Sequence, residues 1–190
     1  MSDKMVEIRW HARGGQGAKT AATLIAAVAL EEGKFSQGFP DYGPEREGAP
    51  MRGYTRISDS PIRVHSAIYE PDIVVVLDSS LLDSVDVAEG LKEGGTILVN
   101  SNRPPAEIRK TLGRQGGKVY TVDATQISID EIGRPIPNTP MVGALMKVMP
   151  VLKLETILHD VEKKFKSKGE KVVQGNFRAI RRAFQEVKEG

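Results

Sequence analysis

A run of glycines between residues 14 and 17 is the part of this 190-residue sequence whose residue types and spacing could bind a charged ligand. The run follows residues 6–11, which alternate with strand periodicity, and precedes an apolar stretch at residues 21–30 that predicts a helix closed by Gly33. At such a strand-to-helix turn, backbone N–H groups without helical partners face whatever approaches, and the helix dipole favours an anion. A phosphate cradle is therefore one interpretation.

Neither of two familiar phosphate-binding fingerprints fits the glycine run. A Walker loop needs glycine directly before a Lys-Thr pair and again five residues earlier, but these positions hold Ala18 and Arg13. The dinucleotide fingerprint matches residues 15–17, yet Thr20 stands where the third glycine belongs, and no acidic residue closes a clear second strand. An NTPase and a plain NAD site are disfavoured. The glycine run is equally consistent with a tight turn, in which the glycines only permit positive φ, and with a phosphate cradle.

The sequence contains no cysteine and three histidines. It therefore supplies no disulfide, no thiolate nucleophile and no cysteine-ligated zinc or iron–sulfur site. His11, His65 and His159 are far apart, and a packed or solvated role is favoured for His11 and His159. We assign no catalytic residue and no metal ligand to this chain, and expect any redox centre to lie on another chain.

Length and composition indicate one globular domain spanning residues 1–190. The net charge of +2 is too small to suggest nucleic acid, and 39% hydrophobic with 27% charged residues is ordinary. No apolar run approaches the roughly 20 residues that cross a bilayer. We expect a cytoplasmic protein that binds neither nucleic acid nor membrane.

Short apolar runs and helical patterns alternate along the middle of the chain. Three runs predict buried parallel strands, at residues 73–77, 96–99 and 118–122. Helices are predicted at residues 81–91 and 105–112. The alternation predicts an α/β fold with a doubly wound, mostly parallel sheet. Ligands gather at the carboxyl ends of such strands, where the glycine run would meet Asp78, Asn100 and Asp123. Capping of the following helices is favoured for each aspartate alone.

Three further segments complete the predicted architecture. An inserted β-hairpin is predicted from residues 53–57 and 62–68, joined by Ser-Asp-Ser-Pro. Residues 37–50, rich in glycine, proline and charge, predict an ordered loop. C-terminal helices are predicted at residues 140–149, 154–165 and 170–187, the first with Thr139 as N-cap and Pro140 at its first position.

Four segments, in order along the chain, resemble one protein family. They are the glycine run, Tyr-Gly-Pro-Glu-Arg at 42–46 with Gly-Ala-Pro at 48–50, Glu-Pro-Asp at 70–72, and Asn-Thr-Pro-Met at 138–141 followed by Gly-Ala. Together they are similar to the gamma subunit of the 2-oxoacid:ferredoxin oxidoreductases, of which pyruvate:ferredoxin oxidoreductase is the best-known member. The resemblance covers nearly the whole chain.

The resemblance implies a division of labour between chains. Members of this family convert a 2-oxoacid, coenzyme A and oxidised ferredoxin to acyl-CoA, CO2 and reduced ferredoxin. Thiamine diphosphate, magnesium and iron–sulfur clusters are expected on partner chains, which are alpha and beta thiamine-binding subunits and a ferredoxin-like delta subunit in a heterotetramer. This chain is expected to contribute assembly and coenzyme A binding. Pyruvate is the favoured substrate among several 2-oxoacids.

The resemblance also implies where coenzyme A would bind. The implicated residues are Gly14, Gly15, Gln16, Gly17, Ala18, Lys19, Arg46 and Asn138. Arg46 could pair a phosphate in bidentate fashion. Relatives often carry a second basic residue after this arginine, but Glu47 stands there, and we expect it to point away or to pair with Arg46.

Two other classes of function stay open at this point. One is a free-standing α/β module that binds a nucleotide or a partner and has no redox role. The other, an independent enzyme, is disfavoured because neither Gly-x-Ser-x-Gly nor His-Glu-x-x-His occurs. An obligate subunit would leave apolar interface patches uncovered when isolated, which distinguishes it from both.

Overall fold

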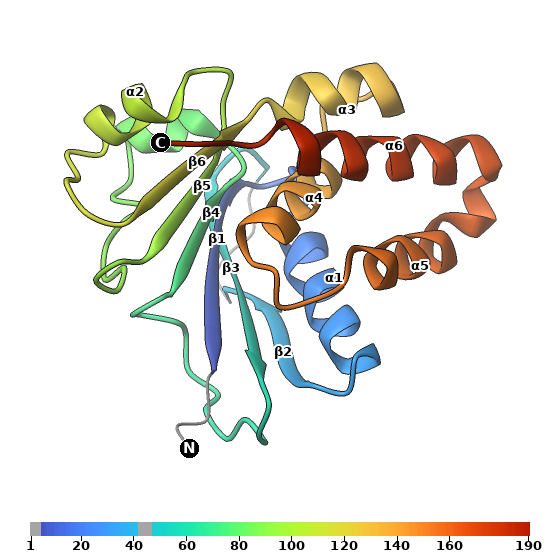
Figure 1. Cartoon of the computed structure of the whole chain (residues 1–190), viewed down its shortest axis with the longest axis horizontal. Helices are drawn as coiled ribbons and strands as arrows, with labels where there is room; N and C mark the ends of the chain where they lie inside the picture. Colours follow the sequence, from blue (N-terminus) through green and yellow to red (C-terminus); the bar gives the residue numbers. More distant parts are fainter. Residues whose placement is uncertain (1–4, 42–46) are drawn as a thin grey trace.

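The computed structural model describes residues 5–41 and 47–190. A seven-stranded sheet in the order β2-β3-β1-β4-β5-β6-β7 forms its centre (Figure 1). The strands are β1 (Val6–Arg13), β2 (Phe35–Pro40), β3 (Pro50–Ser58), β4 (Ile73–Val76), β5 (Thr96–Asn100), β6 (Lys118–Val122) and β7 (Lys188–Glu189). Strands β1, β4, β5 and β6 run parallel, and β2, β3 and β7 are antiparallel to their neighbours. The predicted α/β class with a parallel centre is confirmed.

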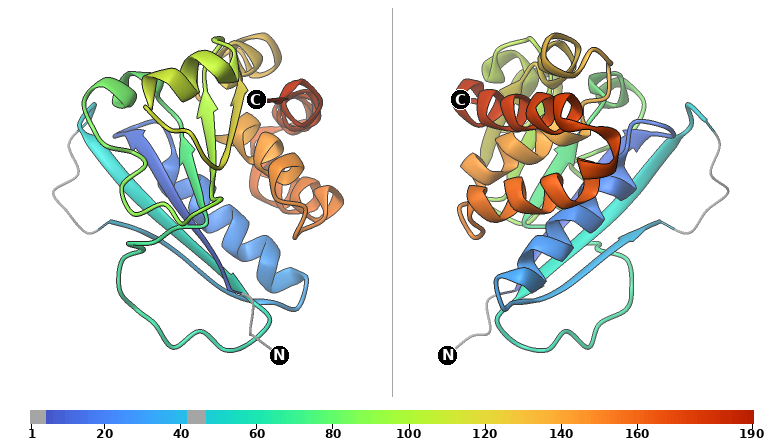
Figure 2. Two further views of the ribbon diagram at one scale, coloured as in Figure 1. Left: turned by 60° about the vertical axis from the view of Figure 1, so that its left-hand side comes forward. Right: turned by 90° about the vertical axis from the view of Figure 1, so that its right-hand side faces the viewer.

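Helices cover both faces of the sheet unequally (Figure 2). They are α1 (Ala18–Glu31), α2 (Pro105–Thr111), α3 (Ala124–Ile132), α4 (Asn138–Val148), α5 (Leu154–Phe165) and α6 (Glu170–Glu186), with short 3-10 turns η1 (Ser79–Asp83) and η2 (Lys166–Lys168). One core joins Ile8 and Trp10 of β1 to α1 and α4–α6. A smaller core on the opposite face joins β4–β6 to Leu81 of η1 and Ile108 of α2.

Strand β1 carries apolar side chains on one face and buried polar ones on the other. Ile8, Trp10 and Ala12 enter the larger core, as the alternation predicts. On the opposite face Arg9 and His11 are only 2% exposed, although charged and polar residues normally face water. That face is covered by irregular chain rather than by a helix, so its polar groups need specific partners.

The hairpin forms from different strands than the sequence predicts. Strand β3 contains the predicted residues 53–57, but its hairpin partner is β2, which lies upstream of it. Residues 62–68 form no strand, because β3 already pairs with β1 on one side and β2 on the other. The prediction that residues 37–40 belong to a loop is also wrong. Gly38 permits the strand there, since a Cβ would lie 2.7 Å from the Ala22 carbonyl of α1.

The helix predicted at residues 81–91 is absent. The structure has η1 followed by turns, although Leu81, Val87 and Leu91 are buried as their helical spacing suggests. The Val87 carbonyl, which a helix over residues 81–91 would pair with the Leu91 N–H, instead accepts from the Arg9 guanidinium, and so does the Glu89 carbonyl. The Arg9 guanidinium therefore supplies hydrogen-bond donors to a segment that forms no α-helix.

The C-terminal third follows its predicted pattern with one shift. Helix α5 spans the predicted residues 154–165, and α6 ends one residue before the predicted 187. Helix α4 begins at Asn138 after Pro137, so Thr139 is not the N-cap. Thr139 instead donates its backbone N–H to Oδ1 of Asn138 at 2.8 Å. The N-cap prediction failed because a second proline precedes the motif and is already compatible with the helix start.

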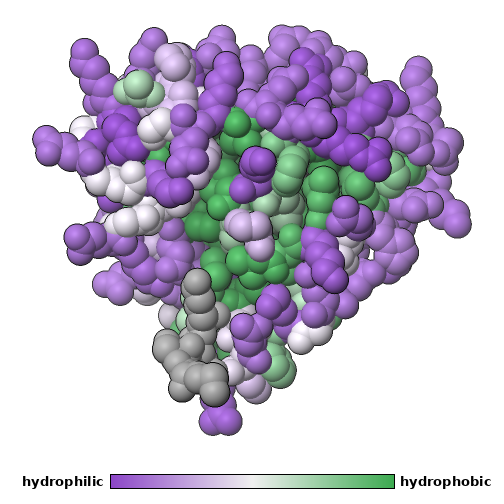
Figure 3. Space-filling model, in the orientation of Figure 1, coloured by the Kyte–Doolittle hydropathy of each residue, from purple (hydrophilic) through white to green (hydrophobic). Residues whose placement is uncertain are grey.

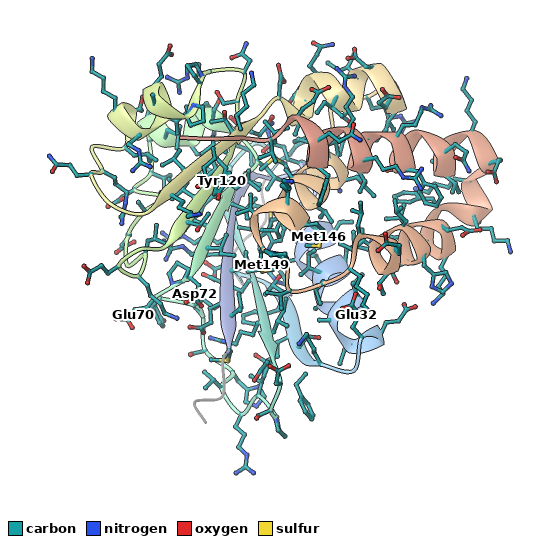
Figure 4. All side chains as sticks on the ribbon, in the orientation of Figure 1. Glu32, Glu70, Asp72, Tyr120, Met146 and Met149 are labelled. Atoms are coloured by element: carbon teal, nitrogen blue, oxygen red, sulfur yellow. The ribbon has the colours of Figure 1, made fainter. Side chains whose placement is uncertain are left out.

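The face seen in Figure 1 has an apolar centre within hydrophilic surroundings (Figure 3). Met146 and Met149, at the end of α4, lie near this centre, and Tyr120 of β6 lies toward it (Figure 4). The acidic residues Glu32 and Asp72 lie farther out in the same view.

Helices α4 and α6 pack closely enough to exclude a side chain at Gly143. A Cβ there would meet the backbone carbonyl of Ile180 and lie 2.8 Å from its Cα. Alanine normally stabilises a helix relative to glycine, but here the backbone contact dominates. We expect Gly143→Ala to lower the free energy of unfolding by about 1–3 kcal/mol in denaturant titrations. Gly116→Ala, which meets nothing within 4 Å, is the control. A Gly143→Ala protein as stable as this control would contradict the packing.

Candidate functional site

The glycine run forms a tight turn between β1 and α1. Gly15 has φ 95° and Gly17 φ 84°, in the left-handed region that favours glycine. The turn closes with a hydrogen bond from the Gln16 N–H to the Arg13 carbonyl at 3.1 Å. The first helical bond of α1 runs from Ala21 to the Gly17 carbonyl. The predicted strand–turn–helix arrangement is confirmed.

The first turn of α1 presents its N–H groups without a capping side chain. Gly17 occupies the N-cap position and offers no side-chain acceptor. No group in the described ranges accepts from the N–H of Ala18, Lys19 or Thr20, and the first turn contains no acidic residue. These donors and the helix dipole together favour a negatively charged ligand group.

Side chains around the turn hold it in place. Gln16 accepts from the Arg13 N–H at 2.8 Å and donates to Asp78 at 2.6 Å. Arg13 contacts the Gly48 carbonyl and the Ser80 hydroxyl, and lies 3.5 Å from Asp78. Burial opposes the charge of Asp78, but hydrogen bonds from Ser80 and Gln16 hold its pKa below the ordinary value. Gln16 therefore braces the turn and directs its side chain toward Asp78.

The segment leading into β3 closes over the turn. The Gly14 N–H donates to the Ala49 carbonyl at 2.9 Å, and the Gly48 N–H donates to the Gly14 carbonyl at 3.2 Å. A short parallel bridge joins Gly14 to Glu47. Residues 47–50 thus lie beside the glycine run.

A cleft of about 830 Å³ opens beside this turn, within the size range of ligand pockets. The turn lines one part, through Gly14, Gly15, Gly17, Ala18 and Lys19. The remaining lining residues are His11, Asp41, Glu47, Ala49, Pro50, Met51, Arg52, Leu81 and Val85. The cleft therefore combines backbone donors, charged side chains of both signs and an apolar part.

The structure brings most of the predicted site residues together. Gln16 and Asn138 are the exceptions among the described ones, since neither lines the main cleft. Asn138 instead packs behind the turn, where a Cβ on Gly17 would collide with its amide nitrogen. Arg46 and its expected pairing with Glu47 lie outside the described residues. Glu47 itself lines the cleft.

A second cleft of about 300 Å³ lies at the carboxyl ends of β4, β5 and β6. Asp78, Asn100 and Asp123 meet there as predicted, but of residues 14–17 only Gln16 lines this cleft, and the three glycines line the larger one. The side chains of Asp78, Asn100 and Asp123 already have partners. Asp123 caps α3 by accepting from the Gln126 N–H, and Asp78 accepts from the Ser80 N–H. The capping role predicted for the two aspartates is therefore confirmed.

Sequence reasoning missed several residues of the main cleft. Arg52 pairs with His11 across β1 and β3, and this register could not be deduced because the hairpin was assigned to other strands. Leu81 and Val85 were assigned to a helix. The one available signal was the alternation of β1, which places Arg9 and His11 on the face opposite Trp10.

His11 is held neutral at the base of the cleft. Burial first, and then the charges of Arg9 and Arg52, lower its pKa to about 3. Its Nε2 lies 3.1 Å from Nε of Arg9. Arginine only donates hydrogen bonds, so Nε2 is the acceptor and the ring proton resides on Nδ1.

Comparison with known proteins identifies the family. The sequence profile described as pyruvate ferredoxin/flavodoxin oxidoreductase matches residues 7–186, and the chain belongs to this family. It is 50% identical to pyruvate synthase subunit PorC of Thermotoga maritima, over 99% of this chain and 97% of that one. It is 48% identical to the common gamma subunit of the pyruvate/ketoisovalerate oxidoreductases of Thermococcus kodakarensis, over 96% and 97% of the two chains. It is thus a gamma subunit of a multi-subunit pyruvate (2-oxoacid):ferredoxin oxidoreductase.

Solved structures agree with this fold. The crystal structure of the Thermotoga maritima subunit superposes with a TM-score of 0.88 at 47% identity, covering 98% of this chain and 99% of that one. A 2-oxoglutarate:ferredoxin oxidoreductase of Magnetococcus marinus matches with a TM-score of 0.78 at 20% identity, over 95% of this chain and 30% of that one. The second likeness shows the fold alone.

No helix in the described ranges is both long and apolar enough to span a bilayer. Nor do the described residues contain a group of three or more histidine and acidic side chains that could hold a metal ion.

The depressed pKa of His11 predicts a specific dependence of stability on pH. The unfolded histidine binds a proton near its ordinary pKa of 6.5, whereas the folded one does so at about 3. Its contribution to stability is therefore complete above pH 6.5 and is lost progressively as the pH falls toward 3. We expect wild type to lose stability relative to His11→Gln with a slope of up to about 1.4 kcal/mol per pH unit in denaturant titrations below pH 6.5.

The exposed His65 supplies the matched control. His65→Gln should keep the wild-type slope. If His65→Gln removes the slope and His11→Gln does not, His11 is not the buried neutral group described here.

Proposed function

We propose that this subunit binds the coenzyme A used by the assembled oxidoreductase, in the cleft beside the glycine run. The observation that carries the proposal is the row of uncapped N–H groups at the start of α1, which faces a cleft of ligand size. Coenzyme A carries a diphosphate and a 3′-phosphate. One of these would accept hydrogen bonds from the N–H groups of Ala18, Lys19 and Thr20.

The glycines serve this arrangement through their backbone. Gly14, Gly15 and Gly17 line the cleft without side chains, so a phosphate can approach the backbone closely. The Lys19 side chain, also on the cleft, would add a positive charge. Gln16 and Asn138 would act indirectly, the first by bracing the turn and the second by packing against Gly17. Arg46 stays a proposed phosphate ligand from the resemblance.

The remaining walls suit the rest of the molecule. Met51, Leu81 and Val85 give the cleft an apolar part, which the mostly uncharged pantetheine arm would occupy. The same fold occurs in the Magnetococcus marinus enzyme, whose structure is described with 2-oxoglutarate, coenzyme A and succinyl-CoA bound. The fold and the cleft chemistry together support coenzyme A over an unspecified nucleotide.

We further propose that the subunit works with alpha and beta thiamine-binding subunits and a ferredoxin-like delta subunit. Thiamine diphosphate, magnesium and the iron–sulfur clusters would reside on those chains and supply decarboxylation and electron transfer. The absence of cysteine from this sequence is consistent with that division. The apolar centre of the face in Figure 3 is the kind of surface that a permanent partner covers. The whole chain, residues 1–190, would act as one domain.

Replacing Gly17 tests the phosphate role. We expect Gly17→Ala to raise the KM of the assembled enzyme for coenzyme A about tenfold or more, with little change in KM for the 2-oxoacid. The new Cβ would displace Asn138 and strain the φ of 84°, which disturbs the N–H groups of α1. Steady-state kinetics of the reconstituted enzyme measures both constants.

Gly33→Ala is the matched control for backbone strain. Gly33 also has a positive φ, 78°, but follows the other end of α1 and meets nothing within 4 Å. It should destabilise the chain without changing the KM for coenzyme A. Wild-type coenzyme A kinetics in an assembled Gly17→Ala enzyme would refute the proposed site.

Purification of the tagged chain from its native cell tests the proposed partners. We expect two thiamine-binding chains and a cysteine-rich ferredoxin-like chain to co-purify and to be identified by mass spectrometry. Recovery of the tagged chain alone, as a monomer, would contradict the proposed assembly.

A further inference from the structure

His11 has one ring nitrogen already committed inside the protein. Arg9 donates from Nε to His11 Nε2, and its other nitrogens donate to the carbonyls of Tyr69, Val87 and Glu89. The guanidinium is thus fixed from several sides and cannot turn away from the ring. Because it carries only donors, it forces Nε2 to remain an acceptor.

The other nitrogen, Nδ1, carries the proton and belongs to a residue that lines the cleft. No group in residues 5–41 and 47–190 accepts a hydrogen bond from it. The side chain is only 2% exposed, yet among the described residues no fully buried side-chain nitrogen or oxygen lacks a hydrogen-bond partner, so Nδ1 is not a donor sealed inside the core. A donor that faces the cleft bonds to water when no ligand is bound, and a ligand oxygen can take the place of that water.

The surroundings of His11 favour a neutral acceptor over a phosphate. Arg52, its cross-strand neighbour, lies 3.7 Å from Glu89, so its charge is partly balanced. Asp41, which accepts from the Tyr54 hydroxyl at 3.3 Å, and Glu47 add negative charge to the cleft. Lys19, the remaining cation of the lining, lies beside the glycine turn. Met51, Leu81 and Val85 complete the apolar part of the wall.

Position along β1 separates His11 from the phosphate-binding end of the cleft. Gly14 follows His11 by three residue steps along an extended strand, which corresponds to about 10 Å between their Cα atoms. A ligand whose phosphate sits on the glycine turn would therefore bring a different part of itself to His11. In coenzyme A, the pantetheine arm follows the diphosphate and carries two amide carbonyls.

We propose that His11 donates a hydrogen bond from Nδ1 to an amide carbonyl of the pantetheine arm of coenzyme A, with Arg9 as the positioning residue that fixes the imidazole tautomer. This inference rests on the proposed coenzyme A site and adds a contact for the uncharged part of the ligand. In this proposal His11 is a binding residue, because it contacts the pantetheine arm and takes no part in making or breaking covalent bonds. The neutral ring suits an amide oxygen, which needs a donor and no charge.

Two substitutions separate the two ring nitrogens. In His11→Gln the side-chain amide reaches the position of Nε2, so its oxygen can accept from Arg9 while the Nδ1 donor is lost. In His11→Asn the amide reaches the position of Nδ1, so a donor remains while Arg9 loses its acceptor. The first variant should stay folded and bind poorly; the second should bind better than the first but unfold at a lower denaturant concentration.

Binding of three probes to the assembled enzyme, measured by calorimetry, tests where the contact lies. For His11→Gln we expect the Kd for coenzyme A and for pantetheine to rise about three- to tenfold, with 3′,5′-ADP unaffected. Gly17→Ala should weaken coenzyme A and 3′,5′-ADP but leave pantetheine unchanged. The opposite patterns in the two variants would locate the arm and the phosphates at different ends of the cleft.

Other outcomes are equally informative. If His11→Gln weakens 3′,5′-ADP as much as coenzyme A, the histidine contacts a phosphate and the inference is wrong. A different outcome is that Gly17→Ala weakens the binding of coenzyme A while His11→Gln leaves it unchanged. This outcome would support the proposed coenzyme A site and contradict the histidine contact. Failure of both variants to alter coenzyme A binding would remove the proposed site itself.

Nitrogen NMR of the histidine-labelled full chain tests the role of Arg9. We expect the wild-type ring to carry its proton on Nδ1, and Arg9→Lys to show a mixture of tautomers. A wild-type spectrum with the proton on Nε2 would overturn the assignment regardless of the binding data.

Discussion

The buried guanidinium of Arg9 is the interaction on which one side of this molecule depends. Its donors satisfy carbonyls of an irregular segment that covers this face of the sheet and has no regular hydrogen-bond pattern of its own. Burying an arginine is costly unless its N–H donors have hydrogen-bond acceptors. The segment that carries the Tyr69, Val87 and Glu89 carbonyls must therefore follow a path that places these acceptors around the guanidinium. The same irregular segment contributes Leu81 and Val85 to the wall of the cleft.

Strand β1 divides the work of the fold between its two faces. Ile8 and Trp10 anchor the larger core, and the Trp10 ring N–H bonds to Thr55, which itself reaches the Ala22 carbonyl of α1. The opposite face supports the cleft and its polar groups. At its end the strand passes directly into the turn that starts α1. A single eight-residue strand therefore fixes the helix whose N-terminus faces the ligand and the floor beneath that ligand.

Sequence periodicity recovered the parallel strands, α1, α5 and the class of the fold, because in each case burial follows a local repeat. It failed where a long-range contact decides. At residues 81–91 the pattern is helical, but the Val87 carbonyl bonds to Arg9 of a distant strand, and the pairing of β2 with β3 depends on which strand edge is available. In the site, the glycine turn was recognisable from spacing alone. Arg52 was not, since its position beside His11 follows from a register that no local pattern encodes.

The contact between Gly17 and Asn138 has a consequence for how this surface can change. The amide of Asn138 occupies the volume that any side chain at residue 17 would need. Gly17 and Asn138, although distant in sequence, are therefore sterically coupled, and a larger side chain at residue 17 is compatible only with a change at residue 138. A route by which this turn acquires a side chain must first move or shrink the residue that opens α4. Asn138 therefore restricts which residues can replace Gly17, and it does so independently of the ligand that the turn binds.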